Sequence, residues 1–165
     1  MATYNLDINP EEHFDFDVFS ITCNDSIYKV IHELNTLLNI DLQLNDLLEF
    51  THKQSEDFYF PLYTFVHNEL NMEFNLLANQ TAFQPKKEHN TKTDYNLFGG
   101  EIEQRISLIP ELENVNFFLL VKGDNRYLHN HTIIETVKSN PSFTFVKEIF
   151  LEDLRDKKVK HNLLF

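Results

Sequence analysis

Cys23 is the residue with the clearest potential for chemistry in this chain. It is the only cysteine among 165 residues, and it ends a predicted strand just before a predicted helix. A helix N-terminus favours the nucleophilic thiolate, and His13 or His32 would be the candidate base. A single cysteine at a strand end is, however, more often a small core residue. We therefore predict no catalytic residue and keep a small enzyme as an alternative.

Histidines and carboxylates are the remaining candidates. His129 and His131 would lie about 200° apart on a helix, so they cannot bind one metal ion from one face. Four glutamates fall close together, but at no spacing typical of paired-carboxylate chemistry: Glu101, Glu103, Glu111 and Glu113. Few glycines, 3 in all, argue against a phosphate-binding loop. We expect neither a metal nor a cofactor.

The net charge of the chain limits the classes of partner that it can bind. The net charge of −12 repels phosphate backbones. The basic groups at 86–87 and 155–160 are short, and we interpret them as solvated faces. We predict no direct binding to nucleic acid. An acidic protein can instead occupy the basic groove of a nucleic-acid enzyme, and such a regulator is a further alternative.

The compartment is predicted from the absence of targeting signals. The opening stretch, MATYNLDINPEEHF, contains no basic residue and no apolar run, and so predicts no secretory signal. No apolar stretch approaches about 18 residues, the length needed to span a membrane. The single cysteine fits a reducing environment. We expect a cytoplasmic protein that does not bind membranes.

Two helices are predicted from apolar residues at helical spacing. The first covers 26–39, with Asn24 and Asp25 as candidate caps. The second covers 126–138 and points Ile133, Ile134 and Val137 inward.

The remaining apolar runs predict strands. Their expected ranges are 13–23, 40–44, 48–51, 57–67, a return strand from Met72, 115–121 and 143–151. Pro61 places the strand 57–67 at an edge or at a bulge, and the doubly apolar strand 115–121 is expected to be central. Residues 1–12 form a flexible lead-in, and 80–107 form one long loop.

The order of elements is β-α-β-β-β-loop-β-α-β within a single domain, 1–165. This order predicts an α+β two-layer sandwich. Its mostly antiparallel sheet would have five or six strands, with both helices on one face.

A short motif resembles that of a known family. Ile109, Pro110 and Glu111, followed after three residues by Val115, Asn116 and Phe117, are similar to the signature of the IPExxxVDY family of small bacterial proteins. The ending, Asn162 to Phe165, resembles the family's Asn-Leu-Ile-Phe ending. The resemblance covers nearly the whole chain. It implies a bacterial cytoplasmic protein and no particular reaction.

Two departures from the motif favour a structural role for it. Asn116 stands where the family has Asp, and Phe117 where it has Tyr. Each change removes an ionisable group and keeps the shape of the side chain. We expect Pro110 to set the entry into a strand and Glu111 to bond backbone N–H groups at that turn.

The leading hypothesis is therefore a non-enzymatic protein-interaction or adaptor domain, with a homodimer as one form of it. Four aromatic residues of the strand 57–67 are the predicted partner edge: Phe58, Phe60, Tyr63 and Phe65. The alternative enzyme or ligand-binding domain would use a cleft near the loop 80–107.

The apolar ending needs a place to bind. A basic run precedes Leu163, Leu164 and Phe165. If these three side chains were left in water, they would form an exposed apolar patch. We expect the tail to fold back and bury Leu164 or Phe165, unless it is a ligand for a partner.

Overall fold

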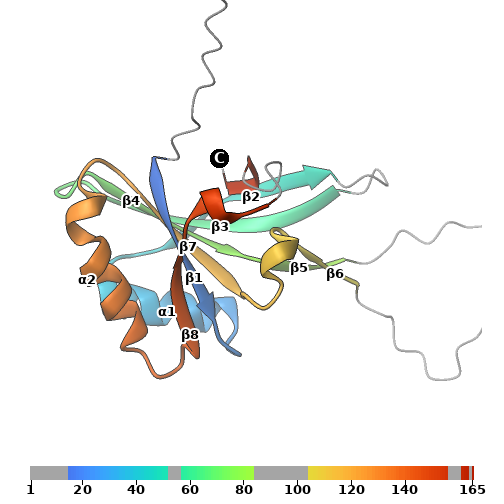
Figure 1. The fold of residues 1–165 in the computed structure, drawn as a ribbon, viewed down its shortest axis with the longest axis horizontal. Coiled ribbons are helices and arrows are strands. Elements are labelled where there is room, and N and C mark those ends of the chain that lie inside the picture. Colours follow the sequence, from blue (N-terminus) through green and yellow to red (C-terminus); the bar gives the residue numbers. More distant parts are fainter. Residues whose placement is uncertain (1–14, 52–56, 84–103, 156–160, 164) are drawn as a thin grey trace, which may run out of the picture.

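The computed structural model describes residues 15–51, 57–83, 104–155, 161–163 and 165. Six strands form the main sheet: β1 (Phe16–Thr22), β2 (Gln43–Thr51), β3 (Asp57–His67), β4 (Met72–Ala78), β7 (Phe117–Lys122) and β8 (Phe145–Ile149). Their order is β2-β3-β4-β7-β1-β8, and every neighbouring pair is antiparallel. The fold is α+β, as predicted (Figure 1).

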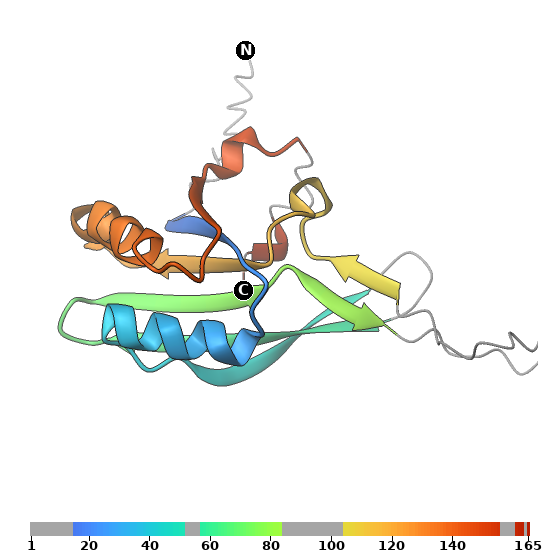
Figure 2. The ribbon, with the colours of Figure 1, turned by 90° about the horizontal axis from the view of Figure 1, so that it is seen from below.

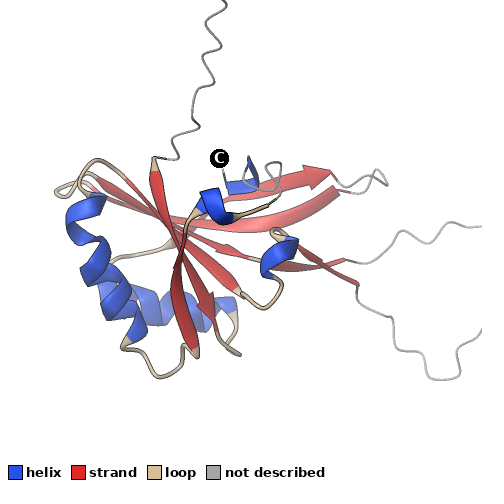
Figure 3. Ribbon diagram, viewed as in Figure 1, coloured by secondary structure: helices blue, strands red, loops and turns tan. Residues whose placement is uncertain are grey.

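Two helices cover one side of this sheet (Figure 3). Helix α1 (Ile27–Leu38) and helix α2 (Arg126–Lys138) both contribute buried side chains to one hydrophobic cluster. The sheet side of that cluster includes Phe19, Leu76 and Leu119. Burying each such side chain contributes about 1.5–3 kcal/mol. Both helices begin and end within one residue of the predicted bounds.

Among the described residues, short 3-10 turns and not a long helix cover the opposite side of the sheet. A second hydrophobic cluster joins Phe60, Leu77 and Leu120 of the strands to residues of three segments, 108–115, 151–154 and Leu163. These segments contain the 3-10 turns η1 (Pro110–Leu112), η2 (Leu151–Asp153) and η3 (His161–Leu163). Figure 2 shows α1 on one side of the strands and η1 and η2 on the other.

The start of α1 differs from the prediction in detail. Ser26 occupies the N-cap position and makes no side-chain capping bond. Asp25 instead forms an ion pair with Lys29 at 3.0 Å, one helical turn further on. The helix ends at Leu38, and the C-cap residue Asn39 adopts a left-handed conformation with φ of 53°, as residues at helix C-termini commonly do.

β2 is one strand where two pieces were predicted. Its pairing with β3 shifts between Leu44 and Asp46, so Asn45 is an extra residue at a bulge. A bulge breaks the alternation of side chains, which is why the sequence pattern suggested a gap.

The predicted long loop, 80–107, contains structure at both ends. β5 (Gln80–Phe83) pairs with β6 (Gln104–Ser107) as a two-stranded ribbon. Residues 84–103 lie outside the described part of the chain, as does the predicted lead-in, 1–12.

The turn between β7 and α2 requires glycine. Gly123 has a φ of +117°, and a Cβ there would lie 2.2 Å from the carbonyl oxygen of Asn71. No other residue type fits this close approach of two turns without displacing backbone.

Candidate functional site

Asn79 organises the segment that contains the family-like motif. It is fully buried and lies between β4 and β5. Its Nδ2 donates to the carbonyl oxygens of Leu112 at 2.8 Å and Val115 at 3.0 Å. Its Oδ1 accepts a bond from the N–H of Ile109 at 2.9 Å. Both amide donors are therefore used within the fold, which makes Asn79 a structural residue.

The motif residues form the corner that Asn79 holds. Ile109 is buried in the cluster opposite the helices, and Pro110 begins the turn η1. The extended backbone of Ile109, with φ of −123° and ψ of 94°, is what a following proline imposes. Glu111 is exposed, and its Oε2 accepts a bond from the N–H of Arg155 at 3.1 Å.

The second half of the motif leads into β7. Val115 and Phe117 are buried on different sides of the sheet. Asn116 Oδ1 accepts a bond from the N–H of Cys23 at 2.9 Å, and its own N–H donates to Ile21. An aspartate at this position has the same acceptor oxygen. The contacts of Asn116 are thus those of a residue that joins β1 to the start of β7.

Cys23 is placed as a core residue. It is buried under the helices, and burial raises the pKa of its thiol above the ordinary value. A raised pKa disfavours the thiolate that nucleophilic attack requires. His32 is exposed on α1, and His13 lies outside the described residues.

The remaining candidate histidines and glutamates form no metal site among the described residues. His129 and His67 line a cavity of about 220 Å³ between the two helices and β3 and β4, whereas His131 is exposed. Glu111 and Glu113 are both exposed, and Glu101 and Glu103 lie outside the described residues. In the part of the chain that the structure describes, no three His, Cys, Asp or Glu side chains are arranged to hold a metal ion.

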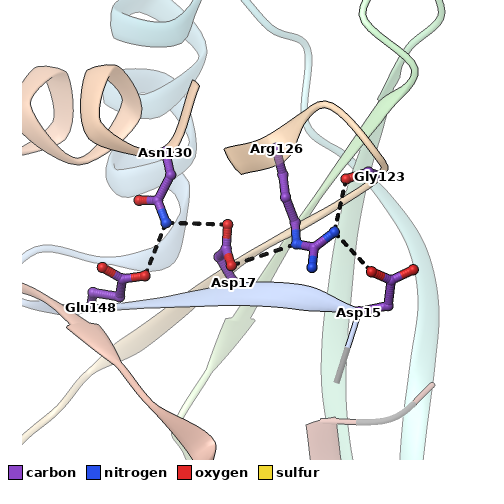
Figure 4. A network of polar contacts seen from close by, with 6 residues as sticks. All are labelled: Asp15, Asp17, Gly123, Arg126, Asn130 and Glu148. Carbon is purple, nitrogen blue, oxygen red and sulfur yellow. Dashed lines mark hydrogen bonds and ion pairs between the residues drawn. The ribbon is translucent and has the colours of Figure 1, made fainter. Parts of the chain in front are cut away.

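A polar network joins α2 to β1 and β8 (Figure 4). Arg126 binds Asp15 at 2.8 Å through Nη1, and its Nε lies 3.5 Å from Asp17. Asn130 Nδ2 bridges two carboxylates, Asp17 at 3.2 Å and Glu148 at 2.9 Å. No local sequence pattern indicates this network, because its members come from three separate segments of the chain.

Asp17 is the electrostatic centre of this network. Its burial is the largest influence and raises the pKa of the carboxyl, the charge of Arg126 lowers it, and the charge of Glu148 raises it again. The net direction is upward from 3.8. Folding therefore favours the protonated form of Asp17, and the network links the stability of the protein to pH.

We expect Asp17→Asn to remove a pH dependence of stability. Between 3.8 and the raised pKa, the folded state binds more protons at Asp17 than the unfolded state does. The wild-type free energy of unfolding therefore rises relative to that of Asp17→Asn as pH falls from about 7 to about 4. Urea unfolding of both proteins across this range measures the difference.

Asp15→Asn is the matched control. It removes an exposed carboxylate from the same arginine and retains Asp17, so it should keep the relative rise. A difference between wild type and Asp17→Asn that stays constant with pH, or that grows in the opposite direction, contradicts the assignment.

The four aromatic residues that were predicted to form a partner-binding edge do not belong to an edge strand of the sheet. β3 lies between β2 and β4, and Phe58, Phe60 and Tyr63 are buried while Phe65 packs against the helix-side core. The prediction from Pro61 fails for the strand as a whole. It holds locally, because Pro61 pairs only with β2 and lies just beyond the last pair of β3 with β4.

Three other apolar residues are exposed on β2 and β3. Leu44, Leu47 and Tyr59 are 58%, 52% and 50% exposed. Leu44 lies opposite Tyr63 and Leu47 opposite Pro61. Alternate residues of a strand face one side, so all three share the side of Tyr63, where the helices pack. We call Leu44, Leu47 and Tyr59 the β2–β3 surface.

The tail folds back on the domain through Leu163. This side chain is 0% exposed and belongs to the cluster opposite the helices. Asn162 Nδ2 donates to the carbonyl oxygen of Leu108 at 2.9 Å. Phe165 is 38% exposed, and Lys122 Nζ lies 4.5 Å from its ring centre and bonds its main-chain oxygen. Leu164 lies outside the described residues.

Comparison with known proteins gives no family for this chain. No protein-family model matches it, and no curated protein is significantly similar to it in sequence. Among the described residues, no helix is both long enough and apolar enough to cross a membrane. The geometry of the described residues is therefore the basis for inferring a function.

Proposed function

We propose that the protein is a non-enzymatic protein-interaction or adaptor domain, and that its partner binds at the β2–β3 surface. The supporting observation is the exposure of Leu44, Leu47 and Tyr59 on one side of two neighbouring strands. Adjacent exposed apolar side chains rimmed by polar residues mark interaction sites. Kinship with the IPExxxVDY family and a bacterial cytoplasmic setting are part of the same proposal, and they rest on the motif and the ending.

The proposal of a small enzyme or ligand-binding domain has less support. Its candidate residues lie on different sides of the sheet, since Cys23 is in the helix-side core and Glu111 lies beside Arg155. The cavity between the helices, at about 220 Å³, is smaller than the pockets of about 300–1,000 Å³ that hold most small ligands. A larger hollow of about 370 Å³ lies beside the bulge of β2, and neither Cys23 nor Glu111 lines it. A cleft at the loop 80–107 falls largely outside the described residues.

The test is capture of partners by tagged full-length protein from its own cells. We expect the double variant Leu47→Glu and Tyr59→Glu to lose a partner that the wild type retains. The control is Tyr127→Glu and Leu128→Glu, which adds the same charges at two exposed apolar positions on α2. Circular dichroism confirms that each variant is folded. Equal loss in both variants, or loss in neither, rejects the β2–β3 surface as the site.

A further inference from the structure

The outer edge of β2 lies next to the β2–β3 surface. β2 is the first strand of the sheet, and within the described ranges no other strand pairs with its outer side. An unpaired edge presents backbone N–H and C=O groups to any strand that can align with it. The bulge at Asn45 interrupts the regular edge. The regular stretch available to a partner therefore begins at Asp46.

Carboxylates follow this edge. Asp46 and Glu49 are exposed, and no described cationic side chain forms an ion pair with either of them. Asp46 Oδ1 accepts a bond from the N–H of Leu47 at 2.7 Å, and Glu49 Oε1 accepts one from the hydroxyl of Tyr59 at 3.4 Å. Both donors are neutral, so no cationic group of the described residues compensates the two negative charges along the edge.

The register of β2 fixes how these charges are presented. Leu47 and Glu49 are alternate residues and face the helix side of the sheet, whereas Asp46 lies opposite Leu62 and faces the other side. A strand added along β2 would place one residue beside each of these positions. Favourable neighbours are a cation beside Asp46, an apolar residue beside Leu47 and a cation beside Glu49.

We propose that β2 binds an extended segment of a protein partner by strand addition. The segment contains two cationic residues separated by two positions, and the position beside Leu47 is apolar. This inference rests on the proposed function of the β2–β3 surface and adds the chemistry of the partner. A second copy of this chain is a poorer occupant, because each copy has a net charge of −12 and self-pairing of β2 brings like charges together.

Selection from a random peptide library on the full-length protein tests the predicted pattern. We expect enriched peptides with the spacing Lys or Arg, two residues of which one is apolar, then Lys or Arg. Enrichment of this pattern should disappear with Asp46→Lys and Glu49→Lys, whose exposed positions allow folding to be retained. Asp124→Lys, an exposed carboxylate after β7, is the control that should still select it.

N-methylation of a selected peptide tests strand addition itself. Only alternate N–H groups of an added strand face β2. Methylating one alternate set should therefore weaken binding about tenfold or more, and methylating the other set should not. Raising the salt concentration should also weaken binding, because these charges are exposed to solvent.

Three outcomes overturn the inference. They are enrichment of acidic or purely apolar peptides, equal effects of the two methylated sets, or a wild-type protein that dimerises through β2 in sedimentation. Each can occur while Leu47→Glu and Tyr59→Glu still abolish partner capture. In that case the proposed function stands and only the chemistry of the partner is wrong.

Discussion

Asn79→Ala should destabilise the protein by about 2–5 kcal/mol, because it leaves two buried backbone groups without the partners they have among the described residues. These groups are the N–H of Ile109 and the carbonyl oxygen of Val115, whereas the carbonyl oxygen of Leu112 still accepts a bond from the N–H of Val115. The loss is a large share of the roughly 5–15 kcal/mol that stabilises a typical domain. Urea unfolding of the full chain, followed by circular dichroism, measures it.

Two further variants separate the bonds of Asn79 from mere burial. Asn79→Asp keeps the size of the side chain but places oxygen where Nδ2 donates to two carbonyl oxygens, so it should be at least as harmful near neutral pH. Asn114→Ala removes an exposed amide from the same segment and should change stability by less than about 0.5 kcal/mol. A small effect of Asn79→Ala would show that the corner holds without it.

Leu163→Ala is expected to reduce the free energy of unfolding by about 2–5 kcal/mol, as other large-to-small changes in a core do. The side chain is 0% exposed and packs in the cluster opposite the helices. Its removal leaves a void under the tail, since the surrounding strands cannot relax fully. The denaturation midpoint of the isolated protein is the measurement.

Phe165→Ala is the comparison within the same tail. Phe165 is partly exposed and its ring contacts Lys122, and an exposed cation–π contact contributes about 0.5–1 kcal/mol. Its loss should therefore be much smaller than that of Leu163. Unchanged stability in Leu163→Ala, combined with loss of a captured partner, would identify the tail as a recognition segment instead.

The sequence was most informative where one periodicity ran without interruption. Both helices could be predicted closely from their apolar spacing, and so could the hairpin of β3 and β4, which turns at 68–71. β7 was correctly expected to be central, because it is apolar on both parities and has buried neighbours on each side. These features depend on local pattern, which a single sequence contains.

The features that were predicted wrongly depend on interactions that a local sequence pattern does not reveal. Asn45 breaks the alternation of β2, so one bulged strand suggested two short ones. The ribbon of β5 and β6 joins two ends of a polar stretch and has few apolar residues to indicate it. The place of Leu163 depends on a groove built from distant segments, and periodicity cannot rank three adjacent apolar residues.

The same limit applies to the candidate sites. The motif at 109–117 was recognisable from its residue types, but the residue that holds it, Asn79, comes 30 positions before Ile109. Asp17, Asn130 and Glu148 meet only because β1 lies beside β8 and under α2. The β2–β3 surface depends on which parity of each strand the helices leave uncovered.

The position of β1 has a consequence for how the chain assembles in time. β1 is made first among the described strands, yet its neighbours β7 and β8 lie about 100 and about 125 residues further along the chain. β2, β3 and β4 pair with one another as sequence neighbours, and only the second side of β4 must also wait for β7. Closing a loop of this length slows folding more than it weakens the folded state. During synthesis, Phe19 and Ile21 therefore remain without their strand partners until β7 has left the ribosome.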